Sequence, residues 1–361
     1  MNGTRLQVVA VLLFTFAFVL RVLLIIRNNF DGLYGQDSYA YFDAAVSIVK
    51  SVAQGQPLAP FFWPIGYPAS VALAFGFVGT GPLAGQLVSI ITGSLIAPIS
   101  FLMTHEMIGQ ATSTIPGLPT ILTRDAAAIT TGLVIAFGGQ LVQSSIVVMS
   151  DAAALFWATL SAYALLRYLR AYKYRLLVLA VAALAMATMT RWVYAALAPV
   201  WVILVVADHV RTHRTRELAL PLALPGLVGF LVLLPQLVLS ATNPAPVLGH
   251  SWLVGWNPLN GFAGTFDNVD GHFEYGMPVG IFYAQPAFNP SYISPILTIF
   301  LLVGAAVVAR RAVSNPAVAF LLFGWIGVQY GFVAGIPYEN IRFGLAYLPP
   351  LAILVGIGIH S

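Results

Sequence analysis

The chain has 361 residues, of which 59% are hydrophobic and only 8% are charged, and its mean hydropathy is +0.88. A soluble domain carries about 25% charged residues, so this composition excludes a soluble globular protein and indicates a chain embedded in lipid. The 16 basic and 12 acidic residues give a net charge of +4. The cations are scattered singly between apolar runs, which argues against a nucleic-acid-binding surface. The lack of cysteine excludes disulfides, thiolate metal sites and cysteine nucleophiles.

The first apolar run follows Arg5 and extends to about residue 26. A signal peptide would be followed by a cleavage site of small residues, and none follows this run. We therefore expect a first helix that is retained and crosses the membrane.

Further apolar runs recur along the chain. A helix needs about 20 apolar residues to cross a bilayer, and the runs predict about ten spans, with an error of about one or two. The fold class is therefore an all-α polytopic membrane protein, with a single domain over residues 1–361. The predicted spans cover residues 4–26, 82–103, 126–141, 152–169, 176–190, 193–207, 218–239, 293–308, 317–333 and 343–359. Residues 67–78 are apolar but too few to cross, which favours a re-entrant or interfacial segment.

The placement of charge gives these spans a direction. With the N-terminus inside, eleven of the 16 basic residues fall on inner loops, Arg21 lies within the first span, and four lie outside: Arg27, Lys50, Arg191 and Arg342. An inner excess of Lys and Arg is the topology signal of membrane proteins. It predicts an integral protein of the plasma or inner membrane with a cytoplasmic N-terminus. Eight of the 12 acidic residues lie outside, and we hypothesise that the outer face carries the chemistry.

Two predicted outer loops are long, residues 28–68 and 242–292. Loops of this length are uncommon unless they are functional. Both are rich in aromatic residues, Gly and Pro, which favours a folded rather than a disordered segment. Within the first loop, residues 37–52 have the pattern of an amphipathic helix that lies in the membrane interface.

Two aspartates on the predicted outer side begin helices. Asp37 begins the interfacial helix, and Asp151 begins the fourth span. Each could be a helix cap, because Asp is favoured there. Alternatively, Asp37 could act as a general base at the membrane surface, and Asp151 could face the interior of the helix bundle.

Two arginines on the same side also have two interpretations. Arg191 and Arg342 could extend toward the lipid headgroups, or they could hold a phosphate group, which the guanidinium binds well. Glu339, three residues before Arg342, could pair with that arginine.

The second loop offers weak candidates for a divalent metal site. If its segment is extended, alternation places Asp270, His272 and Glu274 on one face, although a plain polar loop has the same composition. No cofactor follows with certainty from the motifs, and metal dependence stays open. The sequence contains no Walker A loop, dinucleotide fingerprint, HExxH or GxSxG motif, so nucleotide hydrolysis and serine or zinc proteolysis are not indicated.

In their order and shared sidedness, these motifs resemble the GT-C superfamily of membrane glycosyltransferases. The branch is that of the protein O-mannosyltransferases and the lipid A aminoarabinose transferases. The resemblance rests on five segments: Gly35-Gln-Asp37-Ser-Tyr-Ala-Tyr41, Trp63-Pro-Ile-Gly-Tyr-Pro68, Met149-Ser-Asp151-Ala, Arg191-Trp192 and Arg342-Phe-Gly-Leu-Ala-Tyr-Leu-Pro-Pro350. It implies a GT-C-like helix bundle.

The resemblance also implies an inverting sugar transfer. The donor would be a dolichyl- or polyprenyl-phosphate sugar, and the acceptor a hydroxyl of a lipid, glycan or protein at the extracytoplasmic face. Asp37 would be the catalytic base, and Arg191 and Arg342 would bind the donor phosphate. Supporting or acceptor-side positions would be Asp151, Tyr41, Tyr67 and His272.

Three departures from the resemblance matter. Ser38 stands where many relatives have a second acid, and Trp63 stands where the aminoarabinose transferases have a basic residue. The sequence ends directly after the last predicted span, so we expect no soluble C-terminal domain of the kind that relatives often carry.

Two other functional classes stay open. A secondary transporter or flippase would place polar residues and broken helices in the middle of its spans, whereas the acids here lie at span ends and in loops, and the sequence has no internal repeat. The second alternative is a non-catalytic subunit with this fold in a membrane assembly, which the Ser38 departure keeps open.

Overall fold

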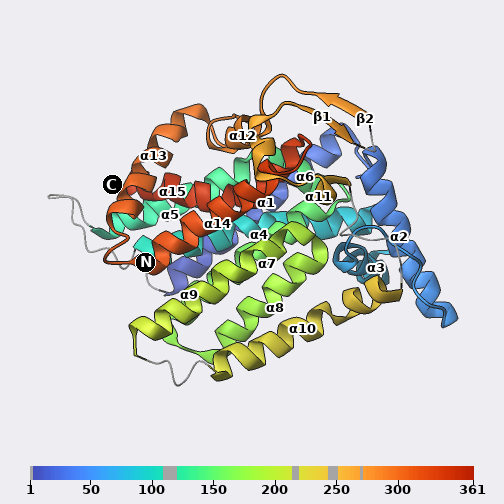
Figure 1. The fold of residues 1–361 in the computed structure, drawn as a ribbon, viewed down its shortest axis with the longest axis horizontal. Coiled ribbons are helices and arrows are strands. Elements are labelled where there is room, and N and C mark those ends of the chain that lie inside the picture. Colours follow the sequence, from blue (N-terminus) through green and yellow to red (C-terminus); the bar gives the residue numbers. More distant parts are fainter. Residues whose placement is uncertain (1–2, 109–119, 214–218, 243–250, 269–270) are drawn as a thin grey trace.

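The computed structural model describes residues 3–108, 120–213, 219–242, 251–268 and 271–361, shown as a ribbon in Figure 1. Helices make up nearly all of the regular structure, as the sequence predicted. The described strands form one antiparallel hairpin, in which β1 (Thr265–Asn268) pairs with β2 (Gly271–Glu274). The protein is thus an all-α membrane protein with a small hairpin in its second long loop.

Each of the ten predicted spans coincides with helical structure, and the third is divided between two helices. Seven helical segments are long and apolar enough to cross a bilayer: α1 (Gly3–Asn28), α4 (Pro82–Ile108), α7 (Ser150–Ala171), η1 with α9 (Trp192–Arg211), most of α10 (Ala219–Thr242), α14 (Pro316–Ala334) and η6 with α15 (Ile341–His360). Two more are apolar but shorter, α8 (Tyr174–Thr190) and α13 (Pro295–Arg310). The bent pair formed by α5 (Thr120–Phe137) and α6 (Gly139–Ile146) makes the tenth.

The third predicted span is not one continuous helix, because it breaks at Gly138. The axes of α5 and α6 differ by 53° across this glycine. Gly138 has the non-helical ψ angle of 106°, and the N–H of Gln140 donates to the carbonyl of Ser291, 2.6 Å away, instead of to its own helix. A bend caused by glycine and by a lost helical hydrogen bond is a common origin of kinks. As a result, the polar helix α6 takes a different direction from the apolar α5.

The short helices of the two long loops gather at one end of the bundle. Figure 1 shows α2 (Gly35–Gln54), α3 (Gly66–Val78) and the hairpin at the end opposite both chain termini. The predicted interfacial helix is therefore present as α2, and residues 67–78 form the 13-residue helix α3. The second loop also contains α11 (Ser251–Val254), η4 (Pro258–Phe262), α12 (Val279–Ala284) and η5 (Gln285–Ala287).

The second loop is fastened to the end of α14. The indole N–H of Trp256 donates to the carbonyl of Phe332 at 2.8 Å, and the amide of Asn260 donates to the carbonyl of Gly335 at 2.8 Å. These contacts satisfy carbonyl groups that a helix end leaves without intrahelical partners. They hold the loop over the end of the bundle that carries α2.

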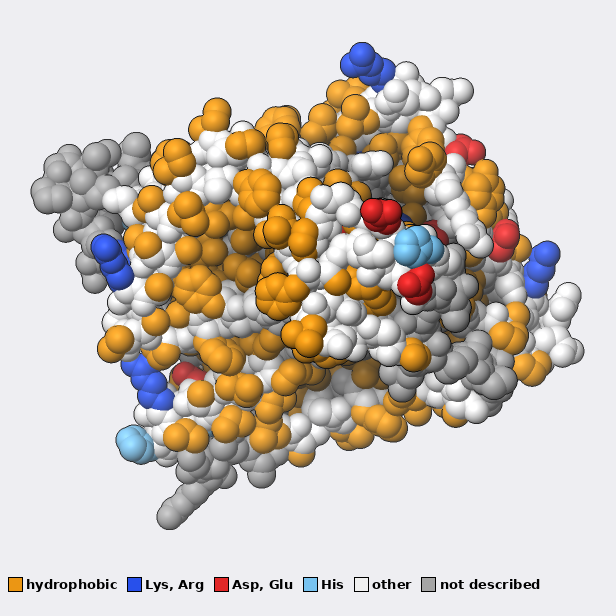
Figure 2. Space-filling view, turned by 45° about the horizontal axis from the view of Figure 1, so that its top comes forward, with side chains coloured by type: hydrophobic (Ala, Val, Ile, Leu, Met, Phe, Trp, Pro, Cys, Tyr) orange, Lys and Arg blue, Asp and Glu red, His pale blue; other side chains and the backbone are white. Residues whose placement is uncertain are grey.

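The flank of the bundle is strongly hydrophobic. Figure 2 shows hydrophobic side chains spread over the side of the molecule, with charged groups gathered mainly toward its two ends. Large apolar side chains on the outer helices are exposed to the surroundings, among them Leu12 and Leu23 of α1, Leu231 of α10 and Ile299 of α13. In water such a surface would be an aggregation site, whereas in a bilayer it faces lipid. The chain is therefore an integral membrane protein.

The interior of the bundle depends on close contact between α13 and α15. Gly304 lies against the backbone of Leu354, and Gly358 lies against the carbonyl of Phe300. A Cβ atom at either glycine would overlap backbone atoms of the facing helix. Small residues at helix contacts allow this approach in membrane proteins, and α15 is the most buried of the candidate spans.

We expect Gly358→Val to destabilise the protein by about 1–3 kcal/mol, the usual range for overpacking a tightly packed interior. The backbone of α13 cannot move away without opening the contact along α15. Thermal unfolding of the purified protein in detergent measures the effect. Gly327→Val is the matched control, because Gly327 is exposed and a Cβ there meets open space. Equal unfolding temperatures for the two variants would contradict the packing argument.

Candidate functional site

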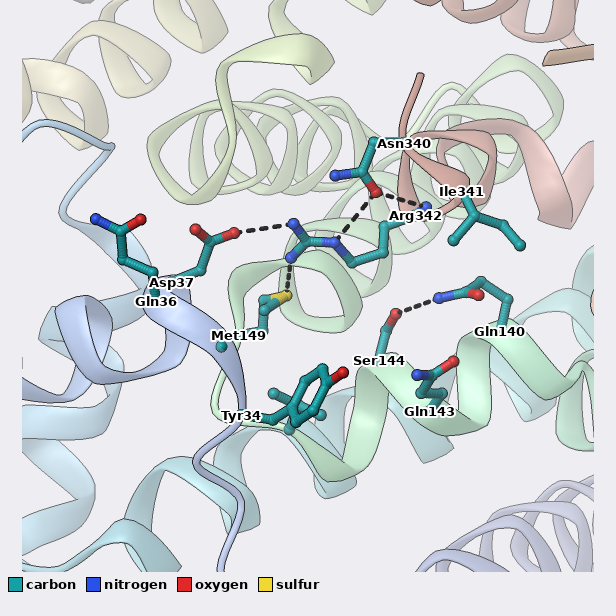
Figure 3. A pocket seen from close by; sticks show the side chains of 12 residues that line it. Tyr34, Gln36, Asp37, Gln140, Gln143, Ser144, Met149, Asn340, Ile341 and Arg342 are labelled. Atoms are coloured by element: carbon teal, nitrogen blue, oxygen red, sulfur yellow. Dashed lines mark hydrogen bonds and ion pairs between the residues drawn. The ribbon is translucent and has the colours of Figure 1, made fainter. Parts of the chain in front are cut away.

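Asp37 is held in the first turn of α2. The residue before the helix, Tyr34, is extended, with φ −145° and ψ 125°. The buried hydroxyl of Ser38 accepts a hydrogen bond from the Tyr34 N–H at 2.6 Å and donates to the Tyr34 carbonyl at 2.7 Å. Ser38 thus stabilises the start of the helix, and Asp37 makes no cap with its side chain. Its carboxylate instead points out of the helix toward Arg342, as Figure 3 shows.

Asp151 also lies in the first turn of its helix, α7. It is the second residue of the helix and only 4% of its side chain is exposed. One carboxylate oxygen lies 2.5 Å from the guanidinium of Arg191. Neither aspartate is therefore the simple N-cap that sequence position allowed. A carboxylate in the first turn is nevertheless favoured by the helix dipole.

Arg342 lies between the two aspartates, at the start of η6 (Ile341–Tyr347). Its Nη2 atom is 2.9 Å from Asp37 Oδ2, and its Nη1 atom is 3.7 Å from Asp151 Oδ2. The side chain also contacts the sulfur of Met149, and its Nε–H donates to the amide oxygen of Asn340 at 3.3 Å. These contacts fix the direction of the guanidinium group.

Arg342 therefore pairs with Asp37 and not with Glu339, so the pairing suggested by sequence position is wrong. The Oε1 atom of Glu339 is buried without a hydrogen-bond partner. Burial raises the pKa of this carboxyl group above its ordinary value.

Four charged side chains from four elements thus form one ion-pair network: Asp37 of α2, Arg342 of η6, Asp151 of α7 and Arg191 at the end of α8. The guanidinium of Arg191 also lies over the ring of Phe343, 5.0 Å from its centre, a cation–π contact. Two positive and two negative groups balance one another. Balanced pairing is what a largely buried set of charges requires, because each unpaired charge would carry a large desolvation cost.

The two predicted tyrosines lie behind this network. The Tyr41 hydroxyl forms a 2.8 Å hydrogen bond with Ser150, and its ring stacks on Trp63 at 5.2 Å. Burial raises the pKa of Tyr41 to about 12, so it stays a neutral phenol. Tyr67 is fully buried against Tyr41, and its hydroxyl bonds to Ser89 at 2.7 Å. Tyr41 reaches a cavity, and Tyr67 supports it from within.

Two cavities meet at the ion-pair network. The larger, of about 450 Å³, has walls of aromatic and apolar side chains and also contains Arg191; its aromatic residues are Tyr41, Phe62, Trp63, Trp192, Phe273, Phe332, Tyr338 and Phe343. The smaller, of about 310 Å³, is lined partly by the polar helix α6. Gln36, Asp37, Asn340 and Arg342 line both. The Asp37–Arg342 pair therefore lies where the two cavities adjoin. Trp63, which stands where the aminoarabinose transferases have a basic residue, lines the larger cavity.

His272 lies on the hairpin and lines neither cavity. His272 faces Asp267 across the two strands, with 2.7 Å between Nδ1 and the carboxylate, and both side chains are exposed. Among the residues that the structure describes, no three His, Asp or Glu side chains gather as a metal site. Asp270 lies outside the described residues, so the Asp270, His272 and Glu274 site stays a prediction, as does the acceptor-side role of His272.

We expect the His272 imidazole to titrate above the ordinary value of 6.5, because the hydrogen bond and the charge of Asp267 raise its pKa. A raised pKa in the folded state means that the contact stabilises the hairpin fully below pH 6.5. That stabilisation is lost as the pH rises through the raised pKa. An NMR titration of His272 in the wild type and in Asp267→Asn measures the shift. The same titration midpoint in both proteins would show that Asp267 is not its cause.

Several residues of the site escaped the sequence analysis. Gln140, Gln143 and Ser144 line the smaller cavity, and Asn340 holds Arg342. A signal for the first three was present, because Gln-x-x-Gln-Ser-Ser follows an apolar run and breaks its hydrophobicity. Periodicity alone could not show that this segment bends at Gly138 toward Asp37.

Comparisons with known proteins support the fold. No family model matches the sequence, and no curated protein matches it. Among solved structures, ArnT from Cupriavidus metallidurans bound to undecaprenyl phosphate has a TM-score of 0.65 and 15% identity, covering 99% of this chain and 60% of that one. Its apo state has a TM-score of 0.63 and 15% identity, covering 94% and 58%.

A second enzyme has the same architecture. The Archaeoglobus fulgidus oligosaccharyltransferase in complex with Zn and sulfate has a TM-score of 0.56 and 14% identity, covering 97% of this chain and 48% of that one. The chain thus spans about half to three fifths of the length of these structures. At such low identity the similarity shows the fold alone: the chain has the helix-bundle fold of these structures, the GT-C-like bundle that its motifs predicted.

Proposed function

We propose that the protein is an inverting glycosyltransferase. It moves a sugar from a polyprenyl-phosphate carrier to an acceptor hydroxyl at the extracytoplasmic face of the membrane. The observation that carries the proposal is the meeting of a general-base candidate and two arginines at the edge of an apolar, aromatic cavity. A polyprenyl-phosphate sugar has the matching parts: an apolar tail, a phosphate and a sugar. The ArnT structure with undecaprenyl phosphate bound supports a carrier of this kind.

In this proposal the larger cavity receives the donor. Its aromatic walls contact the isoprenoid chain, and Arg191 and Arg342 lie where they can hold the phosphate. Arg342 now pairs with Asp37 at 2.9 Å, so the phosphate competes with that carboxylate for the guanidinium. Donor binding then weakens the Asp37–Arg342 pair and frees the Asp37 carboxylate to accept a proton.

The chemical step conserves charge within the site. The acceptor oxygen forms a bond to the anomeric carbon from the side opposite the phosphate, while its proton passes to Asp37. The bond between the anomeric carbon and the phosphate oxygen breaks, and its electron pair leaves with the polyprenyl phosphate. Asp37 loses one negative charge and the phosphate gains one. Arg191 and Arg342 stabilise the charge that develops on the leaving group, and Asp151 keeps both guanidinium groups in place.

The bent α5–α6 pair is a broken helix, a feature that transporters also have. Here the break delivers polar side chains to the cavity beside Asp37, where a transferase would need them. This position favours transfer over transport.

Covalent transfer is the direct test. The purified protein is incubated with labelled polyprenyl-phosphate sugars and with membrane extracts as acceptors, and both the glycosylated product and free polyprenyl phosphate are measured. Equimolar appearance of the two supports the proposal. Movement of labelled donor across liposomes without product would identify a flippase. Neither transfer nor movement would favour a non-catalytic subunit.

Sidedness has its own test, made simple by the absence of cysteine from the chain. We propose that the hairpin end faces outward. Asp267→Cys adds one thiol at a position that is 85% exposed, and Thr212→Cys adds one at the exposed end of α9. A membrane-impermeant maleimide should label the first and not the second in intact cells. The reverse pattern would overturn the assigned orientation.

A further inference from the structure

The smaller cavity has one aromatic side chain in its wall, Tyr34, whereas the larger one has eight. Twelve residues line the smaller cavity, and its polar groups are mainly uncharged: the amides of Gln36, Gln140, Gln143 and Asn340 and the hydroxyls of Ser144 and Tyr34. The charged groups in its wall are Asp37 and Arg342, which pair with each other. The wall thus combines the apolar side chains of Val147, Met149 and Ile341 with uncharged hydrogen-bonding groups, and its two charges compensate each other.

The bend at Gly138 builds this wall. Gln140, Gln143 and Ser144 occupy one short helix, and the Gln140 amide donates to the Ser144 hydroxyl at 3.3 Å. Figure 3 shows these side chains in the same cavity as the Asp37–Arg342 pair. Gln140 and Ser144 are buried, whereas Gln143 is exposed. The hydrogen-bonded Gln140–Ser144 pair and the accessible amide of Gln143 thus both line the smaller cavity.

We infer that the smaller cavity is the acceptor subsite and that it takes an uncharged, polyhydroxylated group, the hydroxyl face of a carbohydrate. This inference rests on the proposed function and adds the class of acceptor to it. Amide groups both donate and accept hydrogen bonds, as the hydroxyls of a sugar also do. A carbohydrate can therefore exchange hydrogen bonds with these amides in both directions.

Other acceptors fit less well. A phosphorylated lipid or glycan would bring a second phosphate to Arg342, which in the proposed function already holds Asp37 and the donor phosphate, and desolvating an unpaired charge is costly. A peptide would offer one hydroxyl from its Ser or Thr side chain, and the remaining hydrogen bonds to the amides would have to come from its backbone.

Position and size agree with this assignment. The cavity adjoins the proposed base, because Asp37 lies in the walls of both cavities. Its volume of about 310 Å³ is at the lower end of the range of about 300–1,000 Å³ for small-molecule sites. Tyr34 is 68% exposed, and an aromatic ring can pack against the apolar C–H face of a sugar ring.

The test compares three sets of acceptors with one labelled donor: neutral oligosaccharides, the same oligosaccharides carrying a phosphate, and Ser/Thr peptides. We expect transfer to the neutral set. Gln143→Leu should raise the KM for the neutral acceptor about 3- to 10-fold, the effect of one lost hydrogen bond between uncharged groups. Binding of polyprenyl phosphate by the same variant should not change, because Gln143 lines only the smaller of the two cavities.

A charge reversal sharpens the test. Gln143→Lys should raise the KM for the neutral acceptor and lower it for the phosphorylated one, because the new cation compensates the phosphate. Gln54→Leu is the matched control, since Gln54 is an exposed amide at the far end of α2. Its KM for the acceptor should equal that of the wild type. Thermal unfolding of each variant shows whether it is folded.

The outcomes separate this inference from the proposed function. Preferred transfer to phosphorylated glycans or to peptides would overturn the acceptor class and leave the transferase intact. The same would follow from an unchanged KM in both Gln143 variants. No release of polyprenyl phosphate with any donor or acceptor would overturn both.

Discussion

Asp37→Asn is expected to lower sugar transfer about 10²- to 10⁴-fold, the usual contribution of a positioned general base. The amide keeps the size of the carboxylate but cannot take the proton of the acceptor hydroxyl. Donor affinity should stay the same or increase, because Arg342 loses the anion that now competes with the phosphate. Initial rates give the effect on kcat, and binding of polyprenyl phosphate gives the effect on the donor.

Asp43→Asn is the control for this experiment. Asp43 lies on the same helix α2 and is exposed, so its variant should transfer sugar at the wild-type rate. Asp37→Glu retains a carboxylate and should recover part of the lost activity. Equal rates for the wild type and Asp37→Asn would rule out Asp37 as the base, even if the protein proves to be a transferase.

Arg342→Gln is expected to have the second large effect. It should weaken binding of polyprenyl phosphate and lower kcat about 10²- to 10³-fold, the usual consequence of removing a group that stabilises charge in the transition state. Arg191→Gln should act in the same direction and should also destabilise the protein. Its partner Asp151, only 4% exposed, would lose its closest cation, and breaking a buried pair in this way costs about 3–5 kcal/mol.

Lysine substitutions separate charge from geometry. Arg342→Lys keeps the positive charge but loses the planar group that reaches Asp37 and Asn340 together. It should therefore recover donor binding more fully than kcat. Arg27→Gln is the control, because Arg27 is exposed at the end of α1. Unchanged donor binding in both the Arg191 and the Arg342 variants would contradict the phosphate assignment.

Much of the architecture could be predicted because the bilayer acts on each segment separately. A span has to be apolar over its own length. For this reason, hydrophobic runs located the helical segments of the ten predicted spans. The same local logic identified α2 from its amphipathic pattern. It failed at Gly138, where an apolar run gives no sign that the N–H of Gln140 bonds to Ser291, more than a hundred residues away.

The candidate residues were recognisable from their chemistry, but their partners were not. Charges are rare in this chain and costly in a membrane. For this reason the sequence indicated a functional role for Asp37, Asp151, Arg191 and Arg342. Sequence spacing suggested Glu339 as the partner of Arg342. The folded chain instead brings Arg342 to Asp37, which lies 305 positions away. The partner of Arg342 is determined by the packing of α2, α7 and η6 around one point, and not by the short sequence distance to Glu339.

The sequence alone thus established that the chain lies in a membrane, where its spans run and which charges are exceptional. Composition and hydrophobicity determine these features one segment at a time. Three features depend instead on contacts between distant segments. They are the bend that turns α6 inward, the division between an aromatic and an amide-lined cavity, and the ion-pair network of Asp37, Arg342, Asp151 and Arg191. Such contacts exist only once the helices pack, because an ion pair or a cavity wall is a property of the space between segments.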